Sequence, residues 1–232
     1  MIKKGLHIVF LFLFCFQINS QSKNDSLALN FRLEFNKLPL QLNKRYVSAS
    51  LDTLSIEIFR CYISNIQIQY KDNSVFTEKE SYHLLDFDKP DSFIIPLTKK
   101  SDKLISKITF NIGIDSITNN SGALTGDLDP AKGMYWAWQS GYINMKIEGK
   151  SSSCITRQNE FQFHIGGYLQ PYYAMRTMKF NWDKKADDDI NIGIDLFRFF
   201  SNLELKQTNS VMIPGKEAMR LLNYVDKMFY SQ

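Results

Sequence analysis

The sequence is poor in the side chains that most metal, redox and nucleophilic sites use. Its 232 residues include only three histidines and three cysteines. His7 and Cys15 both lie in an N-terminal segment that we expect to be removed, so the mature chain keeps two residues of each type. No C-x-x-C pair is present, which argues against a thiolate zinc or redox motif.

Strong charge and catalytic motifs are also missing. The formal net charge is +4, and it falls to +2 when Lys3 and Lys4 leave with the N-terminal segment. A balance so close to neutral gives no electrostatic reason to expect nucleic acid or an acidic membrane as a partner. The chain has no Ser-His-Asp order, no H-E-x-x-H and no Gly-rich phosphate loop. We therefore expect a protein that is not an enzyme.

The first twenty residues have the form of a secretory signal peptide. Lys3 and Lys4 precede an apolar run, Ile8–Phe16, and Asn19-Ser20-Gln21 offers a cleavage point after small side chains. The apolar run is too short to span a membrane. We expect a signal peptide over residues 1–20, one domain over residues 21–232, and a periplasmic or secreted mature protein.

Cys61 and Cys154 are the cysteines of the mature chain. In an oxidising compartment two cysteines indicate either a disulfide or two unpaired thiols. Ligation of a soft metal such as copper or zinc by the two thiolates is a third interpretation. We place it behind the other two because the cysteines are not spaced as C-x-x-C. The sequence does not show whether the two Cα atoms lie within bridging distance.

Most of the mature chain alternates apolar and polar residues with a period of two, which predicts β-strands. The expected strands cover 27–35, 54–70 with a bend at Ser64-Asn65, 82–87, 108–114, 135–148, 161–165 and 175–182, with a weaker candidate at 199–205.

Helical signals are few. Asp187–Phe200 is ambiguous between helix and strand, whereas Pro214 can open a helix in which Ala218, Leu221 and Val225 recur at helical spacing. The predicted fold is all-β, an antiparallel β-sandwich with a C-terminal helix.

The longest irregular segment, residues 116–132, is rich in oxygen ligands. It contains Asn119, Asn120, Asp127 and Asp129. Such a loop can hold calcium, but the spacing does not match an EF-hand. The same residues are common in turns, and turn formation is the simpler interpretation.

The densest aromatic run is Gly133–Tyr142, which contains Trp136 and Trp138. A buried tryptophan needs a partner for its indole N–H, so two of them this close favour a site over general packing. Downstream, Phe163-His164-Ile165 places His164 on the face away from its apolar neighbours. A surface or hydrogen-bonded histidine is the simpler interpretation of His164 alone, although imidazole also binds copper and zinc.

Several motifs occur in an order that resembles the MbnP-like family, which is named for an exported copper-binding protein of methanobactin operons. They cover most of residues 27–180, and the Trp-x-Trp block is the most specific of them. The motifs are Arg60-Cys61-Tyr62-Ile63-Ser64-Asn65-Ile66, Leu84-Leu85-Asp86, Phe110-Asn111-Ile112-Gly113-Ile114-Asp115-Ser116, Leu128-Asp129-Pro130, the run Gly133–Tyr142, Glu148-Gly149 and Phe163-His164-Ile165-Gly166-Gly167. Cys61 departs from the family pattern, where an aromatic residue is expected.

The resemblance implies an all-β exported protein that binds copper between two histidines and a tryptophan oxidised to kynurenine. It also implies a partner, a diheme peroxidase of the MauG type, that makes the modification. In this chain it implies His83 and His164 as metal ligands, and Trp136 or Trp138 as the oxidised residue.

A second functional reading stays open beside the copper site. In it the chain is a secreted binding module of the carbohydrate or adhesion type, whose Trp136 and Trp138 stack on sugar rings.

Overall fold

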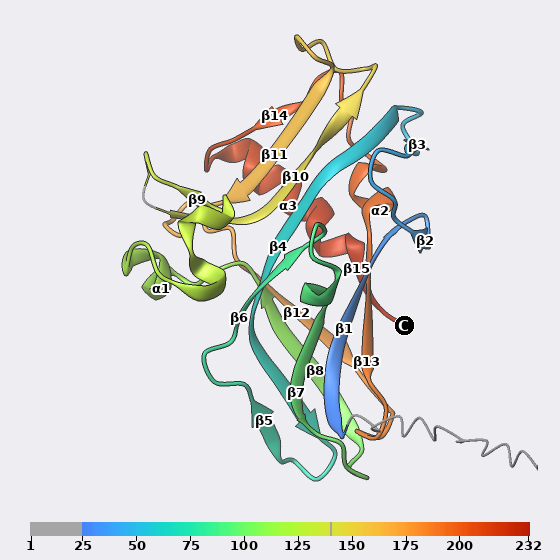
Figure 1. Ribbon diagram of the computed structural model, residues 1–232, viewed down its shortest axis with the longest axis vertical. Helices are drawn as coiled ribbons and strands as arrows, with labels where there is room; N and C mark the ends of the chain where they lie inside the picture. The colour runs from blue at the N-terminus through green and yellow to red at the C-terminus, as the bar shows by residue number, and fades with distance from the viewer. Residues whose placement is uncertain (1–24, 140) are drawn as a thin grey trace, which may run out of the picture.

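Two β-sheets pack against each other in the computed structural model, which describes residues 25–139 and 141–232 (Figure 1). The expected signal peptide, residues 1–20, lies outside the described residues. The all-β sandwich with a C-terminal helix is confirmed. Among the described residues, every helix is too short or too polar to cross a lipid bilayer.

The larger sheet is organised around one long strand, β4 (Thr53–Tyr70). Its apolar side chains alternate into the core, as the sequence predicts, and its register shifts between Ser64 and Gln67, where Asn65 has a φ of 51°. The strands that follow each other across this sheet are β12 (Arg176–Asn181), β8 (Ile105–Ile112), β4, β10 (Gly141–Ser151), β11 (Glu160–Gly166) and β14 (Ser210–Val211). Shorter strands extend it, with β3 (Arg45–Val47), β5 (Val75–Thr77) and β6 (Tyr82–Asp86) on β4 and β9 (Tyr135–Trp136) on β10.

The smaller sheet covers one face of the larger one. Its strands are β15 (Phe229–Ser231), β13 (Ile190–Asp195), β1 (Ser26–Phe35), β2 (Leu38–Pro39) and β7 (Ile94–Lys99). Most strand pairs of the molecule are antiparallel, but β1 pairs with β13 in parallel, and β11 pairs with β14 in parallel. Parallel partners need a long crossover, and more than half of the chain lies between the end of β1 at Phe35 and the start of β13 at Ile190.

The C-terminal helix is α3 (Lys216–Met228), which buries Ala218, Leu221, Leu222, Val225 and Met228. The ambiguous segment 187–200 contains a strand, β13, followed by a short helix, α2 (Leu196–Phe200). The weaker strand candidate at 199–205 is wrong, because Asp195 caps α2 through Phe197 N–H and so starts a helix at that point. The remaining helical turns are α1 (Ser116–Asn120), η1 (Pro90–Phe93), η2 (Gly126–Leu128) and η3 (Pro130–Lys132).

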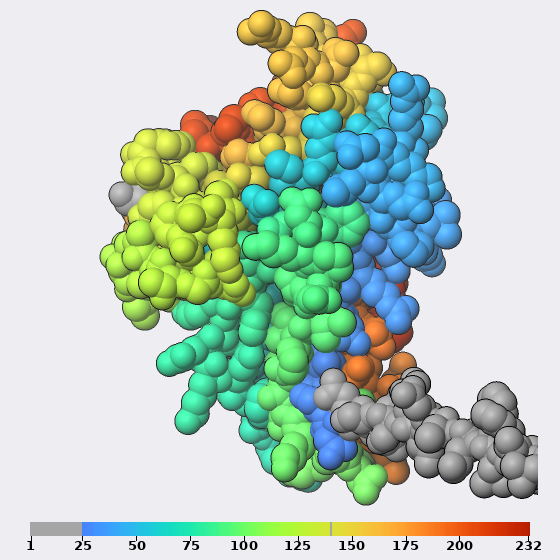
Figure 2. Space-filling model, viewed as in Figure 1, coloured from blue at the N-terminus to red at the C-terminus, as the bar shows by residue number. Residues whose placement is uncertain are grey.

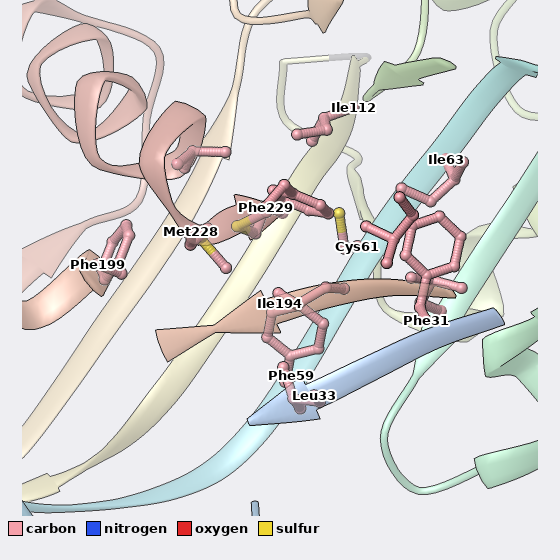
Figure 3. Packing of buried hydrophobic residues seen from close by; sticks show 14 of the residues in the cluster. Phe31, Leu33, Phe59, Cys61, Ile63, Ile112, Ile194, Phe199, Met228 and Phe229 are labelled. Carbon is pink, nitrogen blue, oxygen red and sulfur yellow. The ribbon is translucent and has the colours of Figure 1, made fainter. Parts of the chain in front are cut away.

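Aromatic and aliphatic side chains from both sheets fill the space between them (Figure 3). Phe31 and Leu33 of β1 face Phe59 and Cys61 of β4 across this core. The core occupies one face of the larger sheet, so side chains on its other face are available for a site.

Candidate tryptophan–histidine site

A second, smaller hydrophobic cluster lies on the outer face of the larger sheet. It forms where the segment from α1 to β9 folds over β4, β6 and β10, and this segment is the yellow-green protrusion in Figure 2. Tyr62 Oη donates to Asp127 O at 2.9 Å, and Tyr142 Oη donates to Leu128 O at 3.0 Å. These bonds hold the segment in place. The cluster comprises Tyr62, Leu84, Ile114, Leu128, Met134, Trp136, Tyr142 and Ile143.

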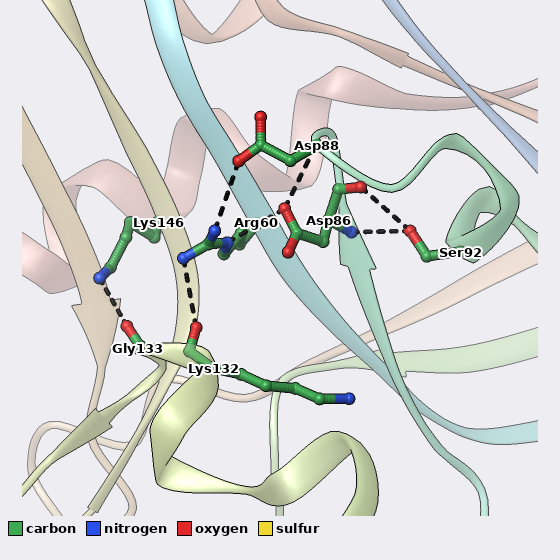
Figure 4. A network of polar contacts seen from close by, with 7 residues as sticks. All are labelled: Arg60, Asp86, Asp88, Ser92, Lys132, Gly133 and Lys146. Atoms are coloured by element: carbon green, nitrogen blue, oxygen red, sulfur yellow. Dashed lines mark hydrogen bonds and ion pairs between the residues drawn. The ribbon is translucent and has the colours of Figure 1, made fainter.

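A row of ionisable side chains crosses the same outer face from strand to strand. The strand register places Asp86 beside Arg60, Arg60 beside Lys146, and Lys146 beside His164. Arg60 Nε lies 3.1 Å from an Asp86 oxygen (Figure 4). Adjacent residues of one row point to the same face, so these four side chains and the covering segment share one side of the sheet.

The two cations of this row attach the covering segment to the sheet. Arg60 donates to Lys132 O at 3.2 Å, and Lys146 donates to Gly133 O (Figure 4). Burial lowers the pKa of Lys146. Gly133 adopts a φ of 71°, which suits glycine at the end of η3. The turn before Met134 is thus positioned by side chains of β4 and β10.

His164 lies on this face in β11 and is only 7% exposed. Its Nε2 is 2.5 Å from Glu148 Oε1 on the neighbouring strand β10. Its other ring nitrogen, Nδ1, makes no hydrogen bond within the part of the chain that the structure describes. A carboxylate on one nitrogen sets the orientation of the ring and leaves the other nitrogen for a ligand, which is the arrangement of metal-binding histidines.

Trp136 packs on the same strand as this histidine. Gly166 is two residues from His164 in β11, and a Cβ atom at Gly166 would be 2.8 Å from Trp136 Cζ3, so the indole packs directly on the glycine. The Trp136 side chain is 5% exposed, and its Nε1 is buried without a hydrogen-bond partner among the described residues. A buried donor without a partner is costly, and such a group calls for an explanation.

Trp138 has a different environment from Trp136. The strand expected over 135–148 is interrupted, because β9 ends at Trp136 and residues 137–139 form a turn. Trp138 is 65% exposed, and its ring centroid lies 6.0 Å from that of Trp136 at an angle of 50°. The two indoles are neighbours, but they do not form one flat surface.

His83 lies away from His164. It pairs with Ile63 across β6 and β4, so strand alternation directs it to the core face, and its Nε2 contacts both Glu78 oxygens at 2.9 Å. Strands β6 and β11 are separated by β4 and β10, which puts roughly 14 Å between them at about 4.8 Å per strand. The structure does not bring the two histidines together, so they do not form the two-histidine site that the resemblance implies.

Cys61 and Cys154 are both free and buried, so the disulfide among the alternatives is not formed. Cys61 pairs with Met145, whereas Cys154 follows Ser151, which pairs with Leu54 at the other end of the β4–β10 ladder. That register separates the cysteines by about 20 Å along the strand. Burial raises the pKa of the Cys61 thiol, and it raises the pKa of Cys154 to about 11.

The oxygen-rich loop uses its polar side chains to accept hydrogen bonds from backbone N–H groups, both of the loop itself and of the neighbouring strands. Asp127 accepts from Leu84 N–H at 2.9 Å, Asp129 caps η3 through Ala131 N–H, and Asn119 accepts from Tyr142 N–H. Over residues 25–139 and 141–232, no cluster of three or more His, Cys, Asp or Glu side chains that could hold a metal ion is present, in this loop or elsewhere. These contacts agree with the turn interpretation of the loop.

The Glu148–His164 pair makes stability depend on pH. The hydrogen bond from His164 holds the pKa of Glu148 below its usual value of 4.5. A carboxyl with a lowered folded-state pKa stabilises the fold above its unfolded pKa and loses that contribution as the pH falls through the folded pKa. We expect Glu148→Gln to cost about 1.5 kcal/mol or more at pH 7. In urea unfolding, its difference from the wild type shrinks below pH 4.5; a difference independent of pH contradicts the pairing.

Comparison with known proteins places this fold and site in context. A family model described as MbnP matches residues 24–213. The structure of MbnP from Methylosinus trichosporium aligns with a TM-score of 0.55 at 12% sequence identity, over 78% of this chain and 79% of that chain. At this identity the structural likeness concerns the fold alone. No curated protein matches the chain.

Proposed function

The chain belongs to the MbnP family, and from this premise we propose that it is an exported copper-binding protein whose site centres on His164 and Trp136. The observation that carries the proposal is a buried indole with an unpartnered N–H, that of Trp136, packed on Gly166 two residues along β11 from the His164 imidazole that Glu148 orients. The proposed role is binding of the metal for storage, scavenging or delivery, without catalysis.

The residues on this face fit a site with one histidine. His164 Nδ1 is the proposed ligand atom, and Glu148 keeps the ring in place from the opposite nitrogen. Cu(I) accepts few ligands, and a neutral imidazole suits it. His83, on the other face of the sheet and paired with Glu78, is not part of this proposal.

Trp136 is the proposed site of oxidation to kynurenine. It packs on Gly166, two residues from His164, whereas Trp138 extends into solvent. Kynurenine carries an aryl amine and a ketone in place of the indole, and these groups give His164 a partner ligand on the same face. The oxidant comes from the proposed partner, a diheme peroxidase of the MauG type.

Mass and metal analysis of protein purified from its own host tests the proposal. We expect copper, and a peptide containing Trp136 in which one carbon has been exchanged for one oxygen. Copper with an unmodified Trp136 removes the partner peroxidase from the proposal and keeps the metal function. The proposed function is contradicted if the purified protein contains no copper and also fails to bind Cu(I) that is added under anaerobic conditions.

A further inference from the structure

A hollow without charged side chains lies next to the tryptophan turn. Its volume is about 300 Å³, at the lower end of the range for small-molecule sites. Gln139 follows Trp138 directly and lines the hollow together with Tyr168, Gln170, Tyr172 and Pro214. Because neither acidic nor basic residues line it, it offers nothing to pair with an ionic ligand.

The loop that carries the two tyrosines is held in a closed form. Ala174 N–H donates to Gly167 O at 2.8 Å, and Ser116 Oγ of α1 donates to Tyr168 O at 2.7 Å. Gly167 has a φ of 132°, and a Cβ atom there would lie 2.2 Å from Tyr172 O. Only glycine fits this position, so the closed form of the loop depends on it. A loop held in this way loses little entropy when a ligand binds.

Four polar groups in the hollow are available to a ligand. The amides of Gln139 and Gln170 and the phenols of Tyr168 and Tyr172 make no hydrogen bond to the described part of the chain. An amide offers both donors and an acceptor, and a phenol offers one of each. This mixed set matches hydroxyl groups, which also donate and accept.

Two large apolar side chains are exposed in the same segments: Leu169 lines the hollow, and Trp138 directly precedes Gln139 in the chain. Trp138 is 65% exposed and Leu169 is 61% exposed. Tyrosine and tryptophan rings present a flat apolar face together with a polar edge. A pyranose ring has the complementary form, with an apolar C–H face and a rim of hydroxyls.

We propose that this hollow, together with Trp138, binds a neutral sugar ring of an oligosaccharide. The aromatic side chains cover the apolar face of the ring, and the amides of Gln139 and Gln170 bind its hydroxyls. The site adjoins the proposed copper site, since the rings of Trp136 and Trp138 lie 6.0 Å apart, but it uses the exposed Trp138 and not the buried Trp136. It does not require copper, and it stands even if the copper proposal fails.

A glycan array that carries neutral and acidic oligosaccharides, followed by calorimetry on the best neutral ligand, tests the site. We expect binding to neutral glycans, with affinity lowered about tenfold or more by Trp138→Ala, because a large aromatic contact is lost. Gln170→Ala, in an exposed loop that leaves the core intact, should also weaken binding. Leu51→Ala serves as the matched control, since Leu51 is 82% exposed and lies outside the hollow.

The outcomes separate the alternatives. Binding that persists in His164→Ala and in a copper chelator, but falls in Trp138→Ala and Gln170→Ala, supports the sugar site. Binding to acidic glycans alone, no glycan binding, or an affinity that Trp138→Ala and Leu51→Ala change equally overturns it. A protein captured through Trp138 without any glycan binding assigns the surface to a protein partner and also overturns the sugar proposal.

Discussion

We expect replacement of His164 with alanine to lower the affinity for copper strongly, whereas replacement of His83 should leave that affinity unchanged. His164 lies on the outer face of the larger sheet, two residues from the Gly166 on which Trp136 packs, and Glu148 holds its ring. Removing the group that hydrogen-bonds to a metal-binding histidine typically lowers the metal affinity about 10–100-fold. Removing the histidine itself should therefore lower the copper affinity by about 100-fold or more.

His83→Ala is the matched control, because it removes the other histidine of the mature chain. His83 contacts Glu78 and lies on the opposite face, roughly 14 Å from His164 across the strands. Distant sites act independently, so the copper affinity of this variant should stay within about twofold of the wild type.

Competition titration with a chromophoric Cu(I) chelator under anaerobic conditions measures both affinities. Circular dichroism on each variant checks that the fold is retained. If His83→Ala lowers the affinity as strongly as His164→Ala, both histidines hold the metal and the one-histidine site is wrong. If neither variant changes the affinity, the metal binds elsewhere.

Phe110→Ala should be among the most destabilising single substitutions in the core. Phe110 is fully buried in β8. The centroid of its ring lies 5.4 Å from that of Phe31 in β1 and 6.1 Å from that of Phe229 in β15, and both of these strands belong to the opposite sheet. The substitution leaves a cavity between the sheets and should cost about 3–5 kcal/mol. For a chain of this length, the melting temperature should fall by about 10 °C or more.

Phe180→Ala is the control for this prediction. Phe180 stacks on Phe110 at 5.8 Å, but it is only partly buried and belongs to the same sheet. We expect it to cost about 1–2 kcal/mol. Thermal and urea unfolding of the two variants measure the difference in their free energies of unfolding. Equal losses of stability would contradict the prediction, because they would show that the contacts of Phe110 with the opposite sheet do not make it more important than Phe180.

The period of two in the sequence predicted most of the core. The strands around β1, β4 and β8 were expected within a few residues, and His164 was expected on the face opposite Phe163, where it lies. The helix after Pro214 was expected from its apolar spacing and is α3. These features depend on side-chain direction within a single element, so a local pattern suffices to predict them.

Other elements were missed because contacts distant in sequence decide them. The short strands β7 and β15 have weak patterns of their own and form only by pairing with β1 and β13. The break at residues 137–139, which separates a buried Trp136 from an exposed Trp138, interrupts what looks like a continuous alternation.

Glu148 is the site residue whose role sequence reasoning missed. It was visible in the Glu148-Gly149 motif, and its polar position in a predicted strand was the only signal. That signal does not identify a partner, because the contact with His164 depends on the register of β10 against β11.

The sequence by itself determined that this is an all-β protein with a C-terminal helix, and that His164 points away from the core. Only the tertiary structure decided which residues meet on the outer face: Trp136 on Gly166, Glu148 with His164, and His83 on the other side with Glu78. The reason is physical. The direction of a side chain follows from the local backbone period, whereas its neighbours follow from strand register and from the segment that covers the sheet, and both depend on hydrogen bonds between residues far apart in the chain.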